Sequence, residues 1–153
     1  HMMSISPDEG ATERAVYLAN VLNLDMGMLY KRRDCSRVVN GRNPIIAHEF
    51  LGSSVEGKDV IILDDMISSG DSILDVARQL KQRKAKRIYA AATFGLFTEL
   101  LSKPYYINCD MSKYLALLID TLNHDSSIGS ILDPADRIQH VVNMYNNGEK
   151  VLP

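Results

Sequence analysis

Two adjacent acids followed by a run of small hydroxyl residues are the part of this sequence whose residue types and spacing could do chemistry. The apolar run VIIL at 60–63 leads directly into Asp64 and Asp65, and a short polar turn follows. The turn contains Ser68, Ser69, Gly70, Asp71 and Ser72. Carboxylates accept hydrogen bonds from hydroxyl groups, and such a turn offers N–H and O–H donors to an anion. A ligand with hydroxyls and one phosphate fits this set, so the stretch predicts a sugar-phosphate site.

The turn runs into a predicted helix at 72–82, which strengthens the anion prediction. The first backbone N–H groups of a helix have no partner within it, and the helix dipole favours negative charge there. The stretch has no lysine and lacks the G-x-x-x-x-G-K-[ST] spacing, which excludes a nucleoside-triphosphate P-loop. The alternative is an ordinary strand-to-helix connection in which Ser72 only caps the helix.

Apolar runs and helical periodicity alternate along the chain and predict an α/β fold with a parallel sheet. The predicted strands cover 3–6, 24–30, 44–51, 58–63, 87–93 and 105–109, and the predicted helices cover 11–22, 72–82, 112–122 and 134–146. Ligands of open α/β sheets bind outside the carboxyl ends of the strands, where the two acids are expected. Neighbouring residues of an extended chain point to opposite faces. One acid can therefore reach a ligand while the other orients the loop or reaches metal-bound water.

Two further groups of charged residues are expected near the same edge of the sheet. Asp8 follows the first predicted strand. Lys31 and Arg33 follow the second, in a basic segment at 31–43 that is predicted to be a mobile loop. The plain alternatives are a helix-capping acid for Asp8 and a solvated basic cluster for the cations.

Length and composition bound the function classes. With 153 residues and 46% hydrophobic content, the chain predicts one domain, at 3–153, with a core of its own. A net charge of -2 provides no broad basic field, so neither nucleic acid nor a membrane surface is expected as a partner. Two unclustered cysteines, with no signal segment or long apolar run, predict a cytoplasmic location. His1 and Met2 are interpreted as a remnant of tag removal and cloning.

An apolar run, two acids, two further residues and a small-residue turn closed by Ser or Thr resemble the signature of type I phosphoribosyltransferases. Four stretches resemble, in the same order, the C-terminal half of the ribose-phosphate pyrophosphokinase family. They are SPDEGATERA at 6–15, YKRRD at 30–34, GKDVIILDDMISSGDSILDVA at 57–77 and AATFGLF at 91–97. The resemblance implies a type I phosphoribosyltransferase-like, Rossmann-like α/β fold. It also implies transfer of diphosphate from magnesium ATP to the anomeric hydroxyl of ribose 5-phosphate, which gives phosphoribosyl pyrophosphate and AMP.

The resemblance implies a role for each motif. The ribose 5-phosphate site takes in Arg33, both acids and the turn at 68–72, with Asp64 on the ribose hydroxyls and the turn on the 5-phosphate. Asp8 resembles the family's magnesium-linked aspartate. Lys31 and Arg33 resemble its catalytic cations, with ATP as co-substrate. Such cations suit phosphoryl transfer, because positioning and charge neutralisation dominate that chemistry. A homo-oligomer built from dimers is implied as well.

Three positions depart from the family pattern. Many members have Asp where Ser68 stands, Gly where Asp71 stands and His where Phe94 stands. A carboxylate at Asp71 must turn away from a bound phosphate or weaken its binding. Two alternatives stay open: a nucleobase phosphoribosyltransferase, which would use the same turn, and a non-catalytic regulatory subunit of the synthetase. The family's N-terminal half, which supplies much of the ATP site, is absent from this sequence.

The connection after AATFGLF is too short for the predicted topology. Only eleven residues run from Phe94 to Pro104, whereas a crossover with its helix needs at least about ten to twelve residues plus turns. Members of the family carry a helix and a further strand here. We therefore expect residues of the natural protein to be missing at or near the junction of Thr98 and Glu99.

Overall fold

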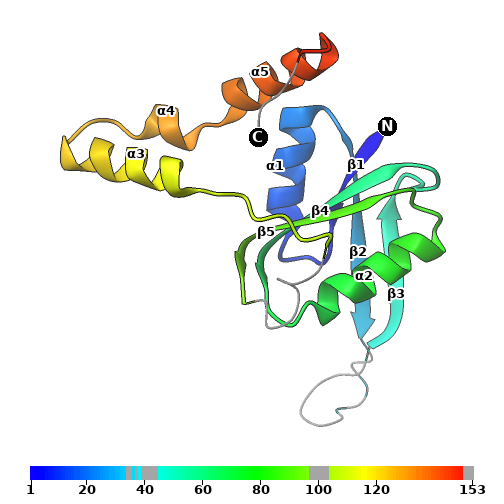
Figure 1. The fold of residues 1–153 in the computed structure, drawn as a ribbon. Helices are drawn as coiled ribbons and strands as arrows, with labels where there is room; N and C mark the ends of the chain where they lie inside the picture. The colour runs from blue at the N-terminus through cyan, green and yellow to red at the C-terminus, as the bar shows by residue number, and fades with distance from the viewer. Residues whose placement is uncertain (34–35, 37, 39–44, 97–103, 150–153) are drawn as a thin grey trace. The chain divides into compact units, whose positions relative to one another are not determined.

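The computed structural model describes residues 1–33, 36, 38, 45–96 and 104–149, and describes the backbone alone at 31–33 and 45–48. Its contacts divide the chain into two compact units, His1–Lys103 and Pro104–Pro153, and each is described by itself (Figure 1). The expectation of one domain at 3–153 stays a prediction. The junction of Thr98 and Glu99 lies outside the described residues.

The first unit is built on a five-stranded sheet with the strand order β3-β2-β1-β4-β5. The strands are β1 (Met2–Ser6), β2 (Asp25–Arg33), β3 (Ile45–Gly52), β4 (Asp59–Ile67) and β5 (Ile88–Gly95). β1 pairs in parallel with β2 and β4, and β4 pairs in parallel with β5. β3 runs antiparallel to β2. The predicted α/β fold with a mostly parallel sheet is confirmed.

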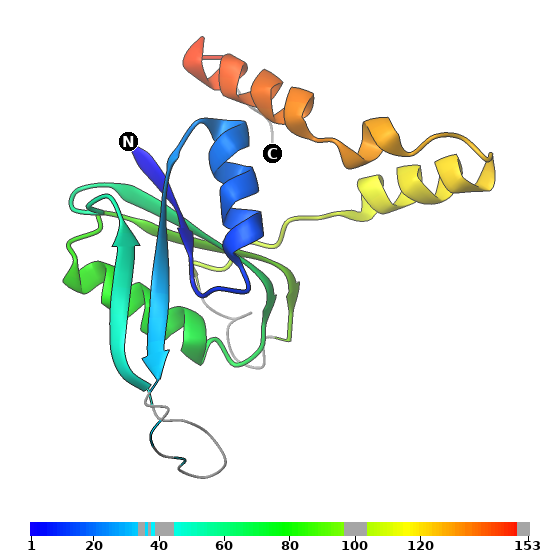
Figure 2. The same cartoon turned by 180° about the vertical axis from the view of Figure 1, so that it is seen from behind.

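Two helices connect the parallel strands and cover opposite faces of the sheet. α1 (Thr12–Leu22) leads from β1 to β2, and α2 (Asp71–Gln82) leads from β4 to β5. These two crossovers move in opposite directions along the strand order, and diverging right-handed crossovers place their helices on opposite faces. In Figure 1 α2 lies in front of the sheet, and in Figure 2 α1 does.

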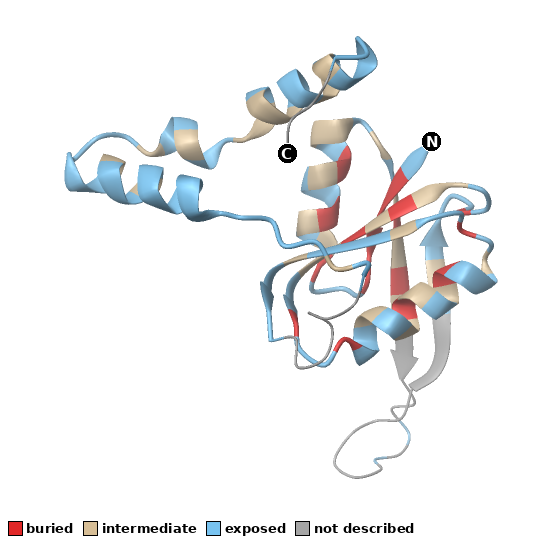
Figure 3. Ribbon diagram, in the orientation of Figure 1, coloured by how far each residue is buried: buried red, intermediate tan, exposed pale blue. Residues whose placement is uncertain are grey.

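The core lies between α2 and the two central strands. Alternate residues of these strands are fully buried, namely Met3 and Ile5 of β1 and Val60 and Ile62 of β4. They form one cluster with the buried face of α2 (Figure 3). The other face of β1 packs on α1, where the hydroxyl of the buried Ser4 donates a hydrogen bond to the Ala15 carbonyl at 2.9 Å. Both faces of β1 are therefore covered, as a central parallel strand requires.

The start of the basic segment differs from its prediction, because β2 continues into it. β2 reaches Arg33, and Lys31 lies opposite His48 in an antiparallel ribbon with β3. The prediction of a loop beginning at Lys31 is therefore wrong, and most of the remaining predicted loop lies outside the described residues. Residues 31–33 are all basic, so this part of β2 lacks the alternation of apolar and polar residues by which a strand is identified.

β5 ends the sheet on one side. In the part of the chain that the structure describes, β5 pairs with β4 and with no other strand. Its sequence IYAAATFG is apolar on both faces, yet most of its side chains are exposed, with Tyr89 at 44% and Phe94 at 56%. Apolar residues on both faces are typical of a covered strand inside a parallel sheet rather than of an edge strand.

The second unit contains α3 (Ser112–Asn123), α4 (Gly129–Leu132) and α5 (Ala135–Asn146). The two helices predicted here are present, and α4 was not predicted. The predicted strand at 105–109 is wrong, because these residues form no strand and Ile107 is 81% exposed. Aromatic and β-branched side chains favour a strand only where neighbouring strands and packing support it. Among the helices described, none is long and apolar enough to cross a membrane.

Candidate functional site

The carboxyl ends of β1 and β4 meet where the strand order reverses. The chain leaves β1 toward β2 on one side and leaves β4 toward β5 on the other. Diverging connections leave a crevice between them, and ligands of open α/β sheets bind in this crevice.

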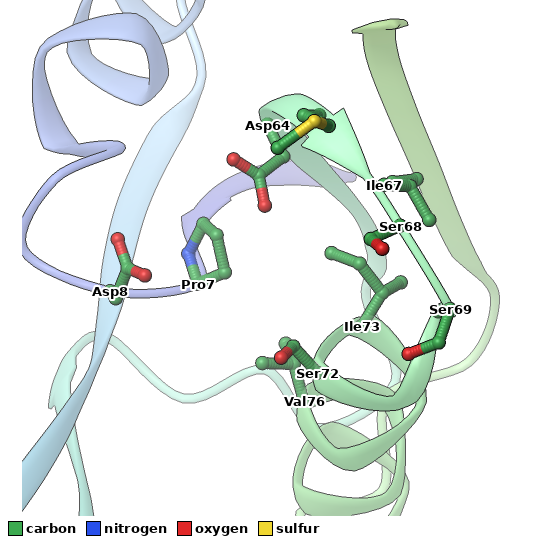
Figure 4. Close-up of a pocket in the computed structure, with 11 residues that line it drawn as sticks. Pro7, Asp8, Asp64, Ile67, Ser68, Ser69, Ser72, Ile73 and Val76 are labelled. Atoms are coloured by element: carbon green, nitrogen blue, oxygen red, sulfur yellow. The ribbon is translucent and has the colours of Figure 1, made fainter. Parts of the chain in front are cut away.

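The segments at this crevice line one pocket (Figure 4). Its lining residues are Pro7 and Asp8 after β1, Asp64, Met66 and Ile67 of β4, Ser68, Ser69 and Gly70 of the turn, and Ser72, Ile73 and Val76 of α2. Figure 4 shows the side chains of Asp8, Asp64 and Ser72 around the same space. The structure thus brings Asp8 and Asp64 together with the predicted phosphate turn.

The two acids lie within β4 rather than after it, because β4 is longer than predicted. β1 pairs with β4 only as far as Ile5 opposite Ile62, whereas β5 stays paired as far as Ile67. β4 therefore projects beyond β1, and its alternation turns Asp64 and Asp65 to different faces. The Asp64 side chain is 23% exposed and lines the pocket, whereas the Asp65 side chain is 73% exposed and does not.

Gly70 shapes the turn at 68–72. Its φ of +86° lies in the left-handed region, which glycine adopts without a steric penalty, and it is the N-cap of α2. Its carbonyl accepts the first hydrogen bond of the helix, from the Leu74 N–H at 2.9 Å. Ser72 is therefore not the capping residue. The N–H groups of the first turn of a helix lack partners within it, and here that turn adjoins the pocket.

Asp71 turns its carboxylate to Ser69. The Ser69 hydroxyl donates a hydrogen bond to Asp71 Oδ2 at 2.8 Å, and the Asp71 N–H donates to the same hydroxyl at 3.4 Å. Asp71 does not line the pocket. Of the two outcomes that the sequence left open, the structure has the carboxylate turned away. Phe94, another departure from the family pattern, lies opposite Met66 and does not line the pocket either.

Asp8 holds the start of α1 and also lines the pocket. Its Oδ1 accepts a hydrogen bond from the Ala11 N–H at 3.1 Å, and the Ser6 hydroxyl donates to its carbonyl at 2.6 Å. In the described part of the chain, no three acidic, His or Cys side chains cluster as a metal site. A hard cation beside Asp8 would take its other ligands from water and a substrate, as Mg²⁺ commonly does in proteins.

Arg14 is a site residue that sequence reasoning missed. It lies on α1, and its Nη2 is 3.3 Å from Asp64 Oδ1 and 3.6 Å from Asp65 Oδ1. It belongs to the SPDEGATERA stretch, but 50 positions separate it from Asp64, so only the packing of α1 brings them together. The available signal was a cation on the helix after β1, beside a neighbouring strand that carries two adjacent acids.

The two acids differ in their affinity for a proton. Burial raises the pKa of Asp64, and the carboxylates of Asp65 and Asp8 add to this rise. A hydrogen bond with Asp64 lowers the pKa of Asp65, and the charge of Arg14 lowers it further. Asp64 is therefore the first of the pair to take up a proton as the pH falls.

Lys31 and Arg33 are placed by the backbone of β2. β1 pairs with β2 as far as Ser6 opposite Met28, and β2 continues to Arg33. Both cations therefore lie on the ribbon beyond the carboxyl end of β1, at the edge of the sheet that carries the pocket. Their side chains lie outside the structural description, so their roles stay predictions.

Comparison with known proteins identifies a family. The model of the phosphoribosyl transferase domain matches residues 3–107. A ribose-phosphate pyrophosphokinase of Mycoplasma genitalium is 29% identical over 151 residues, which cover 99% of this chain and 42% of that protein. One of Thermococcus kodakarensis is 39% identical over 95 residues, which cover 62% of this chain and 31% of that protein. The chain thus spans less than half the length of these relatives.

A similar fold occurs in the crystal structure of phosphoribosylpyrophosphate synthetase from Mycobacterium smegmatis. The TM-score is 0.65 and the sequence identity 21%, over 82% of this chain and 46% of that chain. At this level of identity the likeness concerns the fold, in agreement with the arrangement of sheet and helices described above.

Proposed function

This chain belongs to the phosphoribosyl transferase domain family, and from that premise we propose that it carries the ribose 5-phosphate site of a ribose-phosphate pyrophosphokinase. The observation that carries the proposal is the pocket at the carboxyl ends of β1 and β4, where Asp64 and the turn at 68–72 line the same space. The names of the relatives from Mycoplasma genitalium and Thermococcus kodakarensis support the same reaction.

In the proposed complex the two ends of the substrate meet different groups. The 5-phosphate accepts hydrogen bonds from the turn at 68–72, where a helix N-terminus favours an anion. The ribose hydroxyls donate to the carboxylate of Asp64. Charged acceptors make stronger hydrogen bonds than neutral ones, so an ionised Asp64 is well suited to two neighbouring hydroxyls.

The proposed reaction moves the diphosphate of ATP to this sugar. The anomeric oxygen forms a bond to the β-phosphorus, and the bond between that phosphorus and AMP breaks. Mg²⁺, held by Asp8 together with substrate oxygens, would neutralise phosphate charge. Lys31 and Arg33 would add positive charge from the ribbon. We further propose that the remaining length of the natural protein contacts ATP. The protein would form a homo-oligomer built from dimers, in the cytoplasm.

Titration calorimetry with ribose 5-phosphate tests the substrate. We expect Asp64→Asn to weaken binding by about tenfold or more, because the amide removes a charged acceptor. Asp65→Asn is the matched control, since it makes the same change one residue along at a side chain that does not line the pocket. We expect it to lose less affinity.

Other ligands in the same titration separate the alternatives. A chain that binds phosphoribosyl pyrophosphate but not ribose 5-phosphate would favour a nucleobase phosphoribosyltransferase. A chain that binds neither would favour a non-catalytic regulatory subunit. Either result would contradict the proposal.

Turnover is tested by AMP release from magnesium ATP in the presence of ribose 5-phosphate. We expect little release from this chain alone, because orienting two substrates is worth about 7 to 11 kcal/mol and this chain covers less than half the length of the relatives. Rates of about 1 to 100 per second, abolished by Lys31→Ala, would show that the chain is a complete enzyme.

A further inference from the structure

Arg14 links α1 to β4 beside the pocket, which it does not line. It lies on α1, which follows β1, and its guanidinium contacts both acids of β4, at 3.3 Å from Asp64 and 3.6 Å from Asp65. Its side chain is 40% exposed, and its Nε is buried without a hydrogen-bond partner among the described residues. A buried unpaired donor is unfavourable. Attraction to the two carboxylates offsets this cost and accounts for the position of the side chain.

The hydrogen bonds to Asp64 leave one of its oxygens open to a ligand. Arg14 Nη2 and the Asp65 N–H, at 2.9 Å, both donate to Oδ1. Neither of these two donors bonds to Oδ2. Two donors on Oδ1 fix the plane of the carboxylate and therefore the direction of Oδ2. Such a carboxylate is oriented before a substrate arrives.

Asp64 lies among other carboxylates. Asp65 is its neighbour in the chain, and Asp8 lines the same pocket. Burial and these two carboxylates raise the pKa of Asp64. Arg14 Nη2, 3.3 Å from Asp64 Oδ1, places a cation beside this carboxylate, and an opposite charge at such a distance favours the form that accepts hydrogen bonds and does not donate them.

We infer that Arg14 is a positioning residue of the sugar-phosphate site, which holds the Asp64 carboxylate in the orientation in which Oδ2 accepts the ribose hydroxyls. The inference rests on the proposed function and adds to it a residue outside the acid pair and the turn. Arg14 acts through Asp64, so its removal affects recognition of the ribose more than recognition of the phosphate.

Arg87, which directly precedes β5, provides a matched control for Arg14. At the amino end of β4, Arg87 donates two hydrogen bonds to Asp59, at 2.9 Å from Nε and 2.6 Å from Nη2. The distances from nitrogen to oxygen in this ion pair are shorter than those of Arg14. The pair lies at the amino end of β4, whereas the pocket lies toward its carboxyl end. A purely structural arginine is expected to behave like Arg87.

The test compares Arg14→Met, Arg14→Lys and Arg87→Met by titration with ribose 5-phosphate and with inorganic phosphate. We expect Arg14→Met to weaken ribose 5-phosphate binding by about tenfold and phosphate binding by less than about threefold, with partial recovery in Arg14→Lys. We expect Arg87→Met to change neither affinity. Circular dichroism checks that each variant is folded.

Each other outcome has one meaning. If folded Arg14→Met binds ribose 5-phosphate as the parent does, or loses affinity equally for both ligands, Arg14 does not position the sugar acceptor and the inference is wrong. If Arg14→Met unfolds, Arg14→Lys decides, because a positioning role predicts that it loses ribose 5-phosphate selectively. If the parent binds no ribose 5-phosphate, the proposed function itself fails, and the inference with it.

Discussion

At the scale of single residues, Asp71 is where this pocket departs most clearly from a simple phosphate cradle. Its carboxylate engages the hydroxyl of Ser69, which would otherwise be free to donate to a phosphate. We expect Asp71→Asn to strengthen ribose 5-phosphate binding by about twofold to tenfold, because it removes a negative charge close to the phosphate. The same change is expected to lower the free energy of unfolding by about 0.3 to 1 kcal/mol, since an acid at a helix N-terminus is stabilising.

Calorimetry and urea denaturation measure the two effects of Asp71→Asn. Asp75→Asn is the control, because it removes the same charge from α2 one turn later, away from Ser69. A gain of affinity in Asp75→Asn equal to that in Asp71→Asn would mean that the net charge of α2, rather than a charge close to the phosphate, is responsible.

Much of the site could be predicted because its chemistry is local in the sequence. Asp64 and the turn at 68–72 follow one another near the end of one strand. As a general rule, ligands of open α/β sheets bind at the carboxyl ends of the strands. Arg14 could not be predicted in this way. Its contact with Asp64 depends on the packing of α1 against β4, and nothing in the spacing of the residues specifies it.

At the scale of secondary structure elements, the ribbon of β2 and β3 depends on a close approach of two glycines. Gly52 has φ of +135°, and a Cβ there would lie 2.8 Å from Gly27 Cα and 2.9 Å from the Met26 carbonyl oxygen. Backbone atoms cannot move aside as a flexible side chain can. We expect Gly52→Ala to lower the free energy of unfolding by about 3 to 4 kcal/mol, measured by urea denaturation.

Gly57 provides the comparison for Gly52. Its φ is +71°, and no atom lies within 4 Å of a Cβ built there, so Gly57→Ala adds backbone strain without a clash. We expect it to cost about 1 to 2 kcal/mol. Equal losses in the two variants would mean that the close approach of Gly27 and Gly52 does not limit the ribbon.

The ion pair at the amino end of β4 predicts a specific response to acid. The hydrogen bond from Arg87 and its charge lower the pKa of Asp59. A carboxylate whose pKa is lower in the folded chain stabilises the fold above its unfolded pKa of about 3.9, and this stabilisation is lost as the pH falls through the folded value. We expect Asp59→Asn to flatten the decline in stability below about pH 4.

Urea denaturation at a series of pH values measures this response. Arg87→Met should flatten the same part of the profile, because it returns Asp59 to an ordinary carboxylate. If Asp59→Asn flattens it and Arg87→Met does not, the partner that lowers the pKa of Asp59 is not Arg87.

The predicted elements were right where apolar periodicity reaches the core. β1, β4 and the helices α1 and α2 bury a regular face, and that regularity is visible in the sequence. The ribbon residues 31–33 and the segment 105–109 lack such a face. Their structure depends on which strand edge lies beside them, and local composition does not carry that information.

At the scale of the whole molecule, the edge formed by β5 is the feature that calls for a partner. In the described part of the chain it exposes apolar side chains and offers backbone groups on one side without a neighbouring strand. Such edges promote association between chains. We expect this chain to self-associate at micromolar concentration in sedimentation velocity, and we expect Tyr89→Lys on β5 to reduce the association.

Tyr17→Lys is the matched control for Tyr89→Lys. Tyr17 is 49% exposed, close to the 44% of Tyr89, but it lies on a helix and not on a sheet edge. Equal effects of the two substitutions would mean that added positive charge, rather than the strand edge, limits association. The sequence also predicts that residues of the natural protein are missing near 98–99, in the connection after β5. That prediction comes from the length of the connection and not from any motif.

The divergence of the crossovers at β1 and β4 means that the two walls of the pocket come from separate halves of the chain. One half ends with β3 and the other begins with β4, and they are joined by residues 53–58, in which Ser53 and Ser54 are exposed. Because β3 runs antiparallel, this link lies at the amino ends of β1 and β4, away from the pocket. Cleavage between the two serines would therefore yield a pair of complementing fragments, with Asp8 and Arg14 in one and Asp64 and the turn at 68–72 in the other. Ligand binding would then report their reassembly, so this architecture lends itself to a split sensor.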